Sequence, residues 1–262
     1  MRPTPRQMSM NDSEARALEL YTRAVQSPER EVELLASRFQ RRRGREALTL
    51  REDFSGAGAT SVAWVESHDD REAMAVDRDA RVLAFGRAKA ETLDEGESSR
   101  LSFVARDVSE RSERAFDLIS AMNFSWAMLD EASLRTYLTA AADSLEDDGL
   151  LALEFFGGPR LRVPHVSVHH LDGFTYRFEV KSFAAPFIDV ALHFEERGRI
   201  YEDAFTYRFC LRSKEALDTM LAEAGLRNIT WLYEDRSGRH VARRGRPRRP
   251  LWAAVVLSEP AR

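Results

Sequence analysis

The stretch Leu50-Arg51-Glu52-Asp53-Phe54-Ser55-Gly56-Ala57-Gly58 decides the fold of this 262-residue chain. The apolar run 47–50 predicts a short strand that ends in acidic residues, and the apolar spacing after the glycines predicts a helix over 60–67. Glycine has no Cβ atom, so the backbone at Gly56 and Gly58 can approach a ligand closely. The helix that follows would direct its free N–H groups at the same ligand. The stretch therefore predicts a strand, a ligand-binding loop and a helix.

The same alternation continues along the chain. Strands are predicted over 73–77, 101–107, 116–122 and 149–156, with helices over 80–92 and 134–145 between them. A helix over 213–224 and two closing strands, 228–233 and 251–257, complete the pattern. Strands that alternate with helices in this way predict an α/β fold, doubly wound, with a mainly parallel seven-stranded sheet.

The segments outside this alternation complete the expected domain organisation. Residues 1–12 are expected to be a disordered leader, and residues 13–45 to form N-terminal helices that cap the site. Residues 46–160 and 212–262 would make up the α/β domain. Between these two parts, residues 161–211 contain aromatic, alternating runs that predict a three-stranded antiparallel β insertion after strand five. The insertion could serve as a substrate lid or as a dimer contact.

Composition narrows the class of protein. The net charge of −4, from 39 basic and 43 acidic residues, argues against a general nucleic-acid binder. The adjacent His169 and His170 would face opposite sides of a strand, and no helical His-x-x-x-His pair exists, so no metal site is expected. No secretory signal and no apolar window near ~18 residues is present, so we expect a cytoplasmic protein that does not enter a membrane.

Acidic residues mark the ends of the predicted strands. Asp77 lies 19 residues after Gly58, where a carboxylate can accept hydrogen bonds from the two hydroxyls of a ribose. Asp107 ends the third strand and could bind an adenine amino group, with the Val108 backbone beside it. A nicotinamide-dependent dehydrogenase would need a third glycine at position 61, which is Ser61. The pattern therefore favours an adenosine-containing ligand other than a dinucleotide.

With these motifs, the chain resembles the class I S-adenosylmethionine-dependent methyltransferases. The runs Leu50–Gly58, Val76-Asp77, Arg106-Asp107-Val108 and Phe116–Asn123 match the first four motifs of that superfamily. The runs Asn123-Phe124-Ser125-Trp126 and Phe155–Pro159 are similar to an uncharacterised bacterial branch of it. One departure is Phe54, which replaces the first of the three usual glycines.

The resemblance implies S-adenosylmethionine as the cofactor. Glu52 would take the acidic position that supports the methionine amino group, and Phe54 would point away from the cofactor or pack under it. The implied cofactor-binding residues are Glu52, Phe54, Ser55, Gly56, Gly58, Asp77, Arg78, Asp107, Val108 and Asn123.

Methyl transfer is an in-line displacement at a sulfonium carbon, so the protein must mainly align and desolvate the nucleophile. In related enzymes the segment after strand four faces the methyl group, which makes Asn123 a candidate catalytic residue. Glu154, a carboxylate at the end of a buried strand, is the second candidate, because it could hold a substrate amine or act as a base. The candidate substrate-binding residues are Tyr21, Phe124, Trp126, Phe155, Tyr201 and Tyr207. Ordinary core packing remains the alternative for these aromatic residues.

Three functions stay open from the sequence. The favoured one is methyl transfer to a small-molecule substrate. The second is an RNA or DNA methyltransferase that uses the arginine-rich loop 239–249, and the third is a non-catalytic cofactor-binding subunit. Either a monomer or a homodimer is compatible with the sequence.

Overall fold

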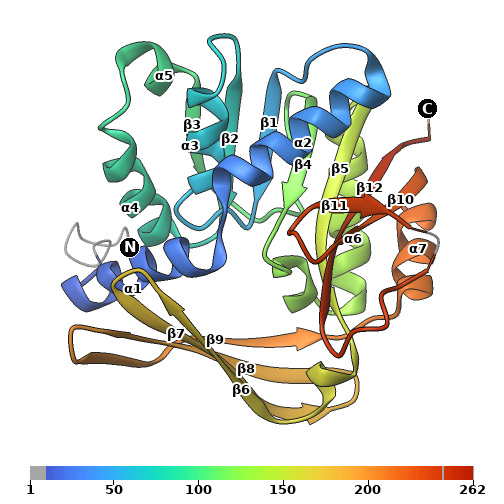
Figure 1. The fold of residues 1–262 in the computed structure, drawn as a ribbon. Coiled ribbons are helices and arrows are strands. Elements are labelled where there is room, and N and C mark those ends of the chain that lie inside the picture. The colour runs from blue at the N-terminus through green and yellow to red at the C-terminus, as the bar shows by residue number, and fades with distance from the viewer. Residues whose placement is uncertain (1–9, 244, 262) are drawn as a thin grey trace.

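The structure is a computed structural model that describes residues 10–243 and 245–261. Its main sheet has the strand order β11-β10-β12-β5-β4-β1-β2-β3 (Figure 1). The five strands β1 to β5 run parallel, whereas β12, β10 and β11 are antiparallel to their neighbours. The strands are β1 (Thr49–Asp53), β2 (Glu72–Asp77), β3 (Leu101–Ala105), β4 (Phe116–Ala121), β5 (Leu145–Gly157), β10 (Leu226–Glu234), β11 (His240–Ala242) and β12 (Trp252–Pro260).

Helices cover both faces of this sheet, which confirms the doubly wound α/β class. The helices are α1 (Asp12–Val25), α2 (Pro28–Arg43), α3 (Ala59–Glu66), α4 (Ala80–Ala90), α5 (Glu95–Ser99), α6 (Glu131–Asp143) and α7 (Lys214–Glu223). Leu118 and Leu150 pack with α2 and α3, whereas their neighbours Ile119 and Leu151 pack with α6 and α7. This alternation follows from the two-residue period of a strand. None of the described helices combines the length and apolar composition needed to span a membrane.

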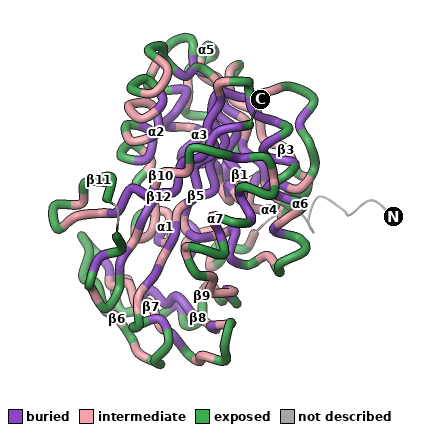
Figure 2. Tube along the Cα trace, turned by 90° about the vertical axis from the view of Figure 1, so that its right-hand side faces the viewer, coloured by how far each residue is buried: buried purple, intermediate pink, exposed green. Residues whose placement is uncertain are grey.

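The sheet has eight strands where seven were predicted. The additional strand, β11, takes three residues from the loop between the two closing strands and pairs with the end of β10. It lies at the outer edge of the sheet and is largely exposed (Figure 2). No apolar alternation marks it in the sequence, because little of it is buried.

The insertion is a separate four-stranded antiparallel sheet, β6-β7-β8-β9, where three strands were predicted. Its strands are β6 (His165–Leu171), β7 (Phe174–Ala184), β8 (Phe187–Glu196) and β9 (Arg199–Cys210). The missed strand, β6, is an edge strand whose Val166 and Val168 are exposed, so it carries no inward apolar pattern. Figure 1 shows this second sheet beneath the carboxyl ends of the main strands, with α1 between the two.

The N-terminal segment divides between the two sheets. The predicted disordered leader falls mainly on residues 1–9, outside the described residues, but Asn11 caps α1 and Asp12 begins it. Leu20 of α1 packs with Phe194 and Tyr201 of the insertion. The second helix, α2, packs on the main sheet through Leu35 and Phe39. Two helices were expected to cap the site. Of these, α1 is the one that contacts the insertion.

Candidate functional site

A cavity of about 450 Å³ opens at the carboxyl ends of β1 to β4, between the main sheet and the insertion. Its volume is within the range of small-molecule and cofactor sites. Parallel α/β sheets place their ligands at this edge. Among the residues that line it are Leu18, Tyr21, Phe54, Ser55, Gly56, Asp77, Arg78, Asp107, Val108, Asn123, Phe205 and Tyr207.

The loop after β1 explains how phenylalanine can stand in the first glycine position. Phe54 has φ = +54°, the left-handed conformation that a glycine would adopt without strain. Its ring lies 5.5 Å from the ring of Tyr137, in an edge-on arrangement, while still lining the cavity. Packing against Tyr137 therefore offsets the strain, which is roughly 1–2 kcal/mol for a residue with a Cβ atom.

The two glycines of the loop have different tasks. Gly56 lines the cavity. Gly58 does not belong to the described lining, and a Cβ atom there would lie 2.8 Å from the Phe103 ring and 3.0 Å from Ala75. Gly58 is thus required for packing the loop on β2 and β3, and its role as a cofactor contact stays a prediction.

A third glycine, Gly86 of α4, was missed in the sequence analysis. A Cβ atom at Gly86 would lie 2.1 Å from the carbonyl oxygen of Ala57. Helix α4 therefore packs directly on the backbone of the loop. The only signal in the sequence is a glycine inside a predicted helix, which is otherwise unfavourable by about 1 kcal/mol.

Asp77 ends β2 beside this loop. Its Oδ2 atom accepts a hydrogen bond from Gly56 N at 2.9 Å, and its Oδ1 atom accepts one from Asp79 N at 2.9 Å. A carboxylate has about four acceptor positions, so each oxygen retains one. The side chain lines the cavity with two oxygen atoms available for a pair of hydroxyl groups. Arg78 is exposed beside it.

Asp107 and Val108 form the neighbouring part of the wall. Asp107 is exposed and accepts a hydrogen bond from Ser109 N at 2.8 Å. Val108 is buried, and its carbonyl oxygen accepts a hydrogen bond from Arg51 Nη2 at 2.6 Å. The position of this turn is therefore fixed from below by an arginine of β1.

Arg51 belongs to a buried polar network that sequence reasoning did not identify. Its Nε atom donates to Asp53 Oδ1 at 2.7 Å, and both side chains are fully buried. Its Nη1 atom donates to Ser112 Oγ at 3.0 Å. Burial raises the pKa of Asp53 to about 6, although the charge of Arg51 lowers it. Arg51 and Asp53 are two residues apart on a buried strand and so share a face of it. This spacing is the signal in the sequence that could have revealed the network.

Glu52 faces the opposite side of β1. Its Oε2 atom accepts hydrogen bonds from Ser61 N at 2.8 Å and Ser61 Oγ at 2.6 Å, so it caps α3. Burial raises its pKa to about 7. Glu52 is not part of the described cavity wall. Its role as the support of a methionine amino group stays a prediction.

The segment after β4 is strained and is held by Glu154. Asn123 and Phe124 both have positive φ, at 57° and 59°. Glu154 Oε2 accepts a hydrogen bond from Asn123 N at 2.5 Å, and Asn123 lines the cavity. Glu154 itself is half-buried behind this segment and is not part of the described wall. Burial raises the pKa of Glu154 to about 8, and the carboxylate of Glu31 adds to the effect.

Glu31, on α2, was missed in the sequence analysis because it looks like an ordinary helix residue. It is buried, and it accepts hydrogen bonds from Thr60 Oγ1 at 2.8 Å and Ser27 N at 3.2 Å. Burial raises its pKa as well. Glu31, Glu52 and Glu154 have no ion pair with a described cation, so this side of the site is rich in buried carboxyl groups.

Two of the six predicted substrate residues, Tyr21 and Tyr207, line the cavity. Phe205, which the sequence analysis missed, also lines the cavity, and its ring lies 5.0 Å from the Tyr21 ring. Phe205 and Tyr207 are two residues apart on β9, so they share a face of that strand. Together with Asn123, these rings form the part of the wall opposite the glycine loop.

The other four predicted substrate residues are core residues, and none belongs to the described lining. Phe124 packs on Trp126 at 5.2 Å, and Phe155 stacks on Trp252 at 5.6 Å. Trp126 Nε1 donates to the carbonyl oxygen of Glu154 at 2.6 Å. Tyr201 is buried between α1 and the insertion. The positive φ angles of Asn123 and Phe124 place Phe124 in this core, and no glycine marks that turn.

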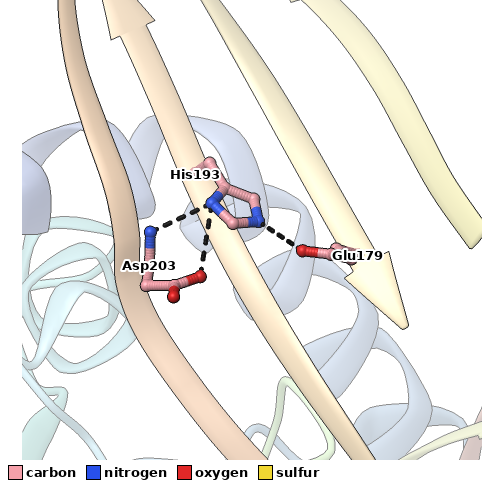
Figure 3. Close-up of side chains that lie close together, drawn as sticks. All are labelled: Glu179, His193 and Asp203. Atoms are coloured by element: carbon pink, nitrogen blue, oxygen red, sulfur yellow. Dashed lines mark hydrogen bonds and ion pairs between the residues drawn. The ribbon is translucent and has the colours of Figure 1, made fainter. Parts of the chain in front are cut away.

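A histidine and two carboxylates meet in the insertion, away from this cavity. Glu179 Oε2 lies 3.1 Å from His193 Nε2, and the Asp203 N–H donates to His193 Nδ1 at 3.0 Å. Figure 3 shows the two carboxylates at opposite nitrogens of the ring. One ligand atom from each of the three residues lies within 4.8 Å of the others. Lys181 also binds Asp203 at 2.6 Å. We interpret the cluster as a polar contact that links β7, β8 and β9.

Comparisons with known proteins place the fold. No protein-family model and no curated protein matches the chain. A solved S-adenosylmethionine-dependent methyltransferase from Clostridium acetobutylicum ATCC 824 is similar, with a TM-score of 0.73 and 14% identity over 94% of this chain and 98% of that one. CalS10, an amino pentose methyltransferase from Micromonospora echinaspora solved with S-adenosylmethionine bound, has a TM-score of 0.65 and 17% identity over 91% and 94% of the two chains.

The sugar N-methyltransferase KedS8 from Streptoalloteichus sp ATCC 53650 has a TM-score of 0.62 and 20% identity over 91% of this chain and 92% of that one. These likenesses extend over nearly the whole chain, insertion included. The protein therefore has the fold of S-adenosylmethionine-dependent methyltransferases.

Proposed function

We propose that this protein is an S-adenosylmethionine-dependent methyltransferase that transfers the methyl group, in line, to the nitrogen of a small-molecule amine. The observation that carries the proposal is the cavity wall at the strand ends, where Asp77, Asp107 and Gly56 lie together. The shared fold with solved methyltransferases supports it.

The residues present fit the cofactor. Asp77 has an acceptor position on each oxygen for the two ribose hydroxyls, and Asp107 would accept from the adenine amino group beside Val108. Ser55 also indicates that a ligand binds here. This residue lines the cavity, and its buried Oγ atom has no hydrogen-bond partner among the described residues. A buried hydroxyl of this kind costs free energy unless a ligand satisfies it. When bound, S-adenosylmethionine would supply the activated methyl group.

The acceptor would lie on the opposite wall. The rings of Tyr21, Phe205 and Tyr207 exclude water and present aromatic faces, which attract a cationic amine. Asn123 lines the cavity at the point where its backbone N–H is bonded to Glu154. The protein's main contribution would be to fix the nitrogen in line with the methyl group.

An amine must lose a proton before it can attack. Glu154 lies behind Asn123 and outside the described wall, so we propose that it receives this proton through one water molecule. Its pKa of about 8, raised mainly by burial, matches a base that operates near neutral pH. KedS8 is described as a sugar N-methyltransferase and CalS10 as an amino pentose methyltransferase, which supports nitrogen as the acceptor atom.

The test is a transfer assay with methyl-labelled S-adenosylmethionine against a metabolite extract and total RNA in parallel. We expect label in cationic small molecules, retained on a cation-exchange resin, with the wild-type protein but not with Asp77→Ala. Label in RNA would favour the nucleic-acid alternative. Tight cofactor binding with no label in either pool would favour a non-catalytic subunit.

A further inference from the structure

A second cavity, of about 360 Å³, lies between α2 and the turn that joins α3 to β2. Arg71 directly precedes β2, and Glu46 precedes β1, so this cavity is at the amino ends of the parallel strands. In Figure 1 these ends point away from the insertion. The proposed cofactor cavity is at the carboxyl ends, and the two cavities share no described lining residue. The proposed transfer reaction does not use the second cavity.

Arg71 is a buried cation in the wall of this second cavity. Its exposed fraction is 8%, and the central carbon of its guanidinium lies 4.2 Å from the centre of the Trp64 ring. The face of an aromatic ring attracts a cation but offers no hydrogen-bond acceptor to its N–H groups. Burial lowers the pKa of Arg71, although the charge of Glu46 raises it. The guanidinium is therefore a charged group that has lost most of its water.

Arg71 differs from Arg51, the other buried arginine of the described residues. Arg51 pairs with Asp53 at 2.7 Å, and all three of its guanidinium nitrogens donate hydrogen bonds. Arg71 has no ion pair with a described carboxylate, and its guanidinium donates to one described acceptor, Ser67 Oγ, at 2.5 Å from Nη1. Its Nε atom is buried without a described partner. Buried N–H groups of a cation are costly without acceptors, so Arg71 indicates a ligand with acceptor oxygens.

The rim of the second cavity is acidic, which restricts the ligand. Glu29 and Glu33 are exposed one helical turn apart on α2, and Glu46 is exposed before β1. Of these three, only Glu46 has an ion pair with a described residue, His68, at 3.4 Å. Three carboxylates around one arginine would repel a phosphate or any other ligand that carries only negative charge. The ligand therefore needs a positive charge in addition to its acceptor oxygens.

Helix α2 also gives the second cavity an apolar part. Glu29, Val32, Glu33 and Ala36 are three or four residues apart, so they share one face of the helix. Val32 is buried and Ala36 is half-buried, and both line the cavity. The volume of about 360 Å³ is within the range of small-molecule sites. One buried cation, a pair of exposed carboxylates and a short apolar surface thus lie within one small cavity.

We propose that the second cavity binds a small zwitterion, an α-amino acid with an aliphatic side chain. Its carboxylate would pair with Arg71, because a planar guanidinium can bind a carboxylate through two parallel N–H groups. Its ammonium group would face Glu29 and Glu33, and its side chain would contact Val32 and Ala36. The site is separate from the proposed transfer reaction and does not depend on it.

The test is calorimetric titration of the full chain with three related probes, in the presence of saturating S-adenosylhomocysteine, which blocks the proposed cofactor site. L-Norleucine carries both charges, hexanoate lacks the ammonium group, and pentylamine lacks the carboxylate. We expect one saturable site for L-norleucine and binding roughly tenfold weaker or less for the other two probes. The variant Arg71→Gln should weaken the binding of L-norleucine roughly tenfold or more.

A second variant, Glu33→Gln, keeps the test decisive if the buried Arg71 variant fails to fold. Glu33 is exposed, so its replacement should leave the fold intact, weaken L-norleucine roughly threefold and leave hexanoate no weaker. The control Glu146→Gln removes the same charge from an exposed position outside the cavity and should change neither probe. Absence of L-norleucine binding by the wild type, equal binding of the three probes, or equal effects of the two glutamate variants would overturn the proposal.

Discussion

The two walls of the cavity differ in how the chain builds them. The proposed cofactor wall, with Gly56, Asp77 and Asp107, comes from turns that directly follow β1, β2 and β3, and buried contacts such as Arg51 with Asp53 hold it from below. The proposed acceptor wall, with Tyr21, Asn123, Phe205 and Tyr207, combines α1, β9 and the segment after β4, which are far apart in the sequence and meet through side chains. The proposed cofactor wall is therefore fixed by backbone turns, whereas the proposed acceptor wall could change through substitution of a few aromatic residues.

Arg51→Met tests the support of the cofactor wall and should have the largest effect. It would leave Asp53 buried without its partner, which costs about 3–5 kcal/mol of unfolding free energy. Urea denaturation measures this loss. The control is Arg135→Met, which breaks exposed pairs with Glu131 and Glu223 and should cost less than about 1 kcal/mol. Equal losses in both variants would show that the buried network has no special role.

Glu154→Gln contrasts a half-buried carboxyl group, which has no ion pair with a described cation, with the fully buried and paired Asp53. The folded-state pKa of Glu154, about 8, lies above the ordinary value of 4.5, so the folded state binds more protons between these values. Wild-type stability should therefore fall as pH rises from 5 to 8, by at most about 1.4 kcal/mol per pH unit from this group. The variant should gain on the wild type over that range, and the difference should level off above pH 8. A constant difference from pH 5 to 9 in urea denaturation would contradict this assignment.

Gly86→Ala tests whether helix packing positions the glycine loop. The added Cβ atom overlaps the Ala57 carbonyl oxygen, so the loop must shift and S-adenosylmethionine should bind roughly tenfold more weakly. Gly245→Ala, at an exposed glycine with open space around it, is the control and should leave calorimetric affinity unchanged. Unaltered binding by the Gly86 variant would mean that the loop adapts freely.

Phe205→Ala should act on the acceptor wall alone. Loss of one aromatic face should raise the KM for an amine acceptor roughly fivefold to thirtyfold, while S-adenosylmethionine affinity changes less than about twofold. Tyr201→Phe, on the same strand but in the core, is expected to change neither quantity. The comparison fails if both variants alter KM alike, or if Phe205→Ala weakens cofactor binding.

The same difference between the walls explains what the sequence could predict. Asp77 and Asp107 each follow their own strand, so strand order alone brings them to one edge. The alternation along β1 also predicts the direction of Glu52, because Glu52 shares a face with Leu50, which packs beneath α2 and α3. That face looks away from the cavity.

The proposed acceptor wall was less predictable, because it depends on the backbone turn after β4 and on how α1 packs against the insertion. Phe124 follows a pair of positive φ angles that no glycine announces. Tyr201 and Tyr207 pair with the same face of β8, so strand alternation does not show that only Tyr207 lines the described cavity. The strands β6 and β11 were missed for a related reason. Both are edge strands with mainly exposed side chains, so burial leaves no pattern in their sequence.

The most direct test of the account is calorimetric titration of the wild type and of Asp77→Asn with S-adenosylmethionine. The account predicts one site per chain in the wild type. In the variant, the loss of charge-assisted hydrogen bonds to the ribose should weaken binding roughly a hundredfold, with the thermal unfolding midpoint little changed. Unchanged affinity in Asp77→Asn, or no binding by the folded wild type, would contradict the assignment of this cavity to the cofactor.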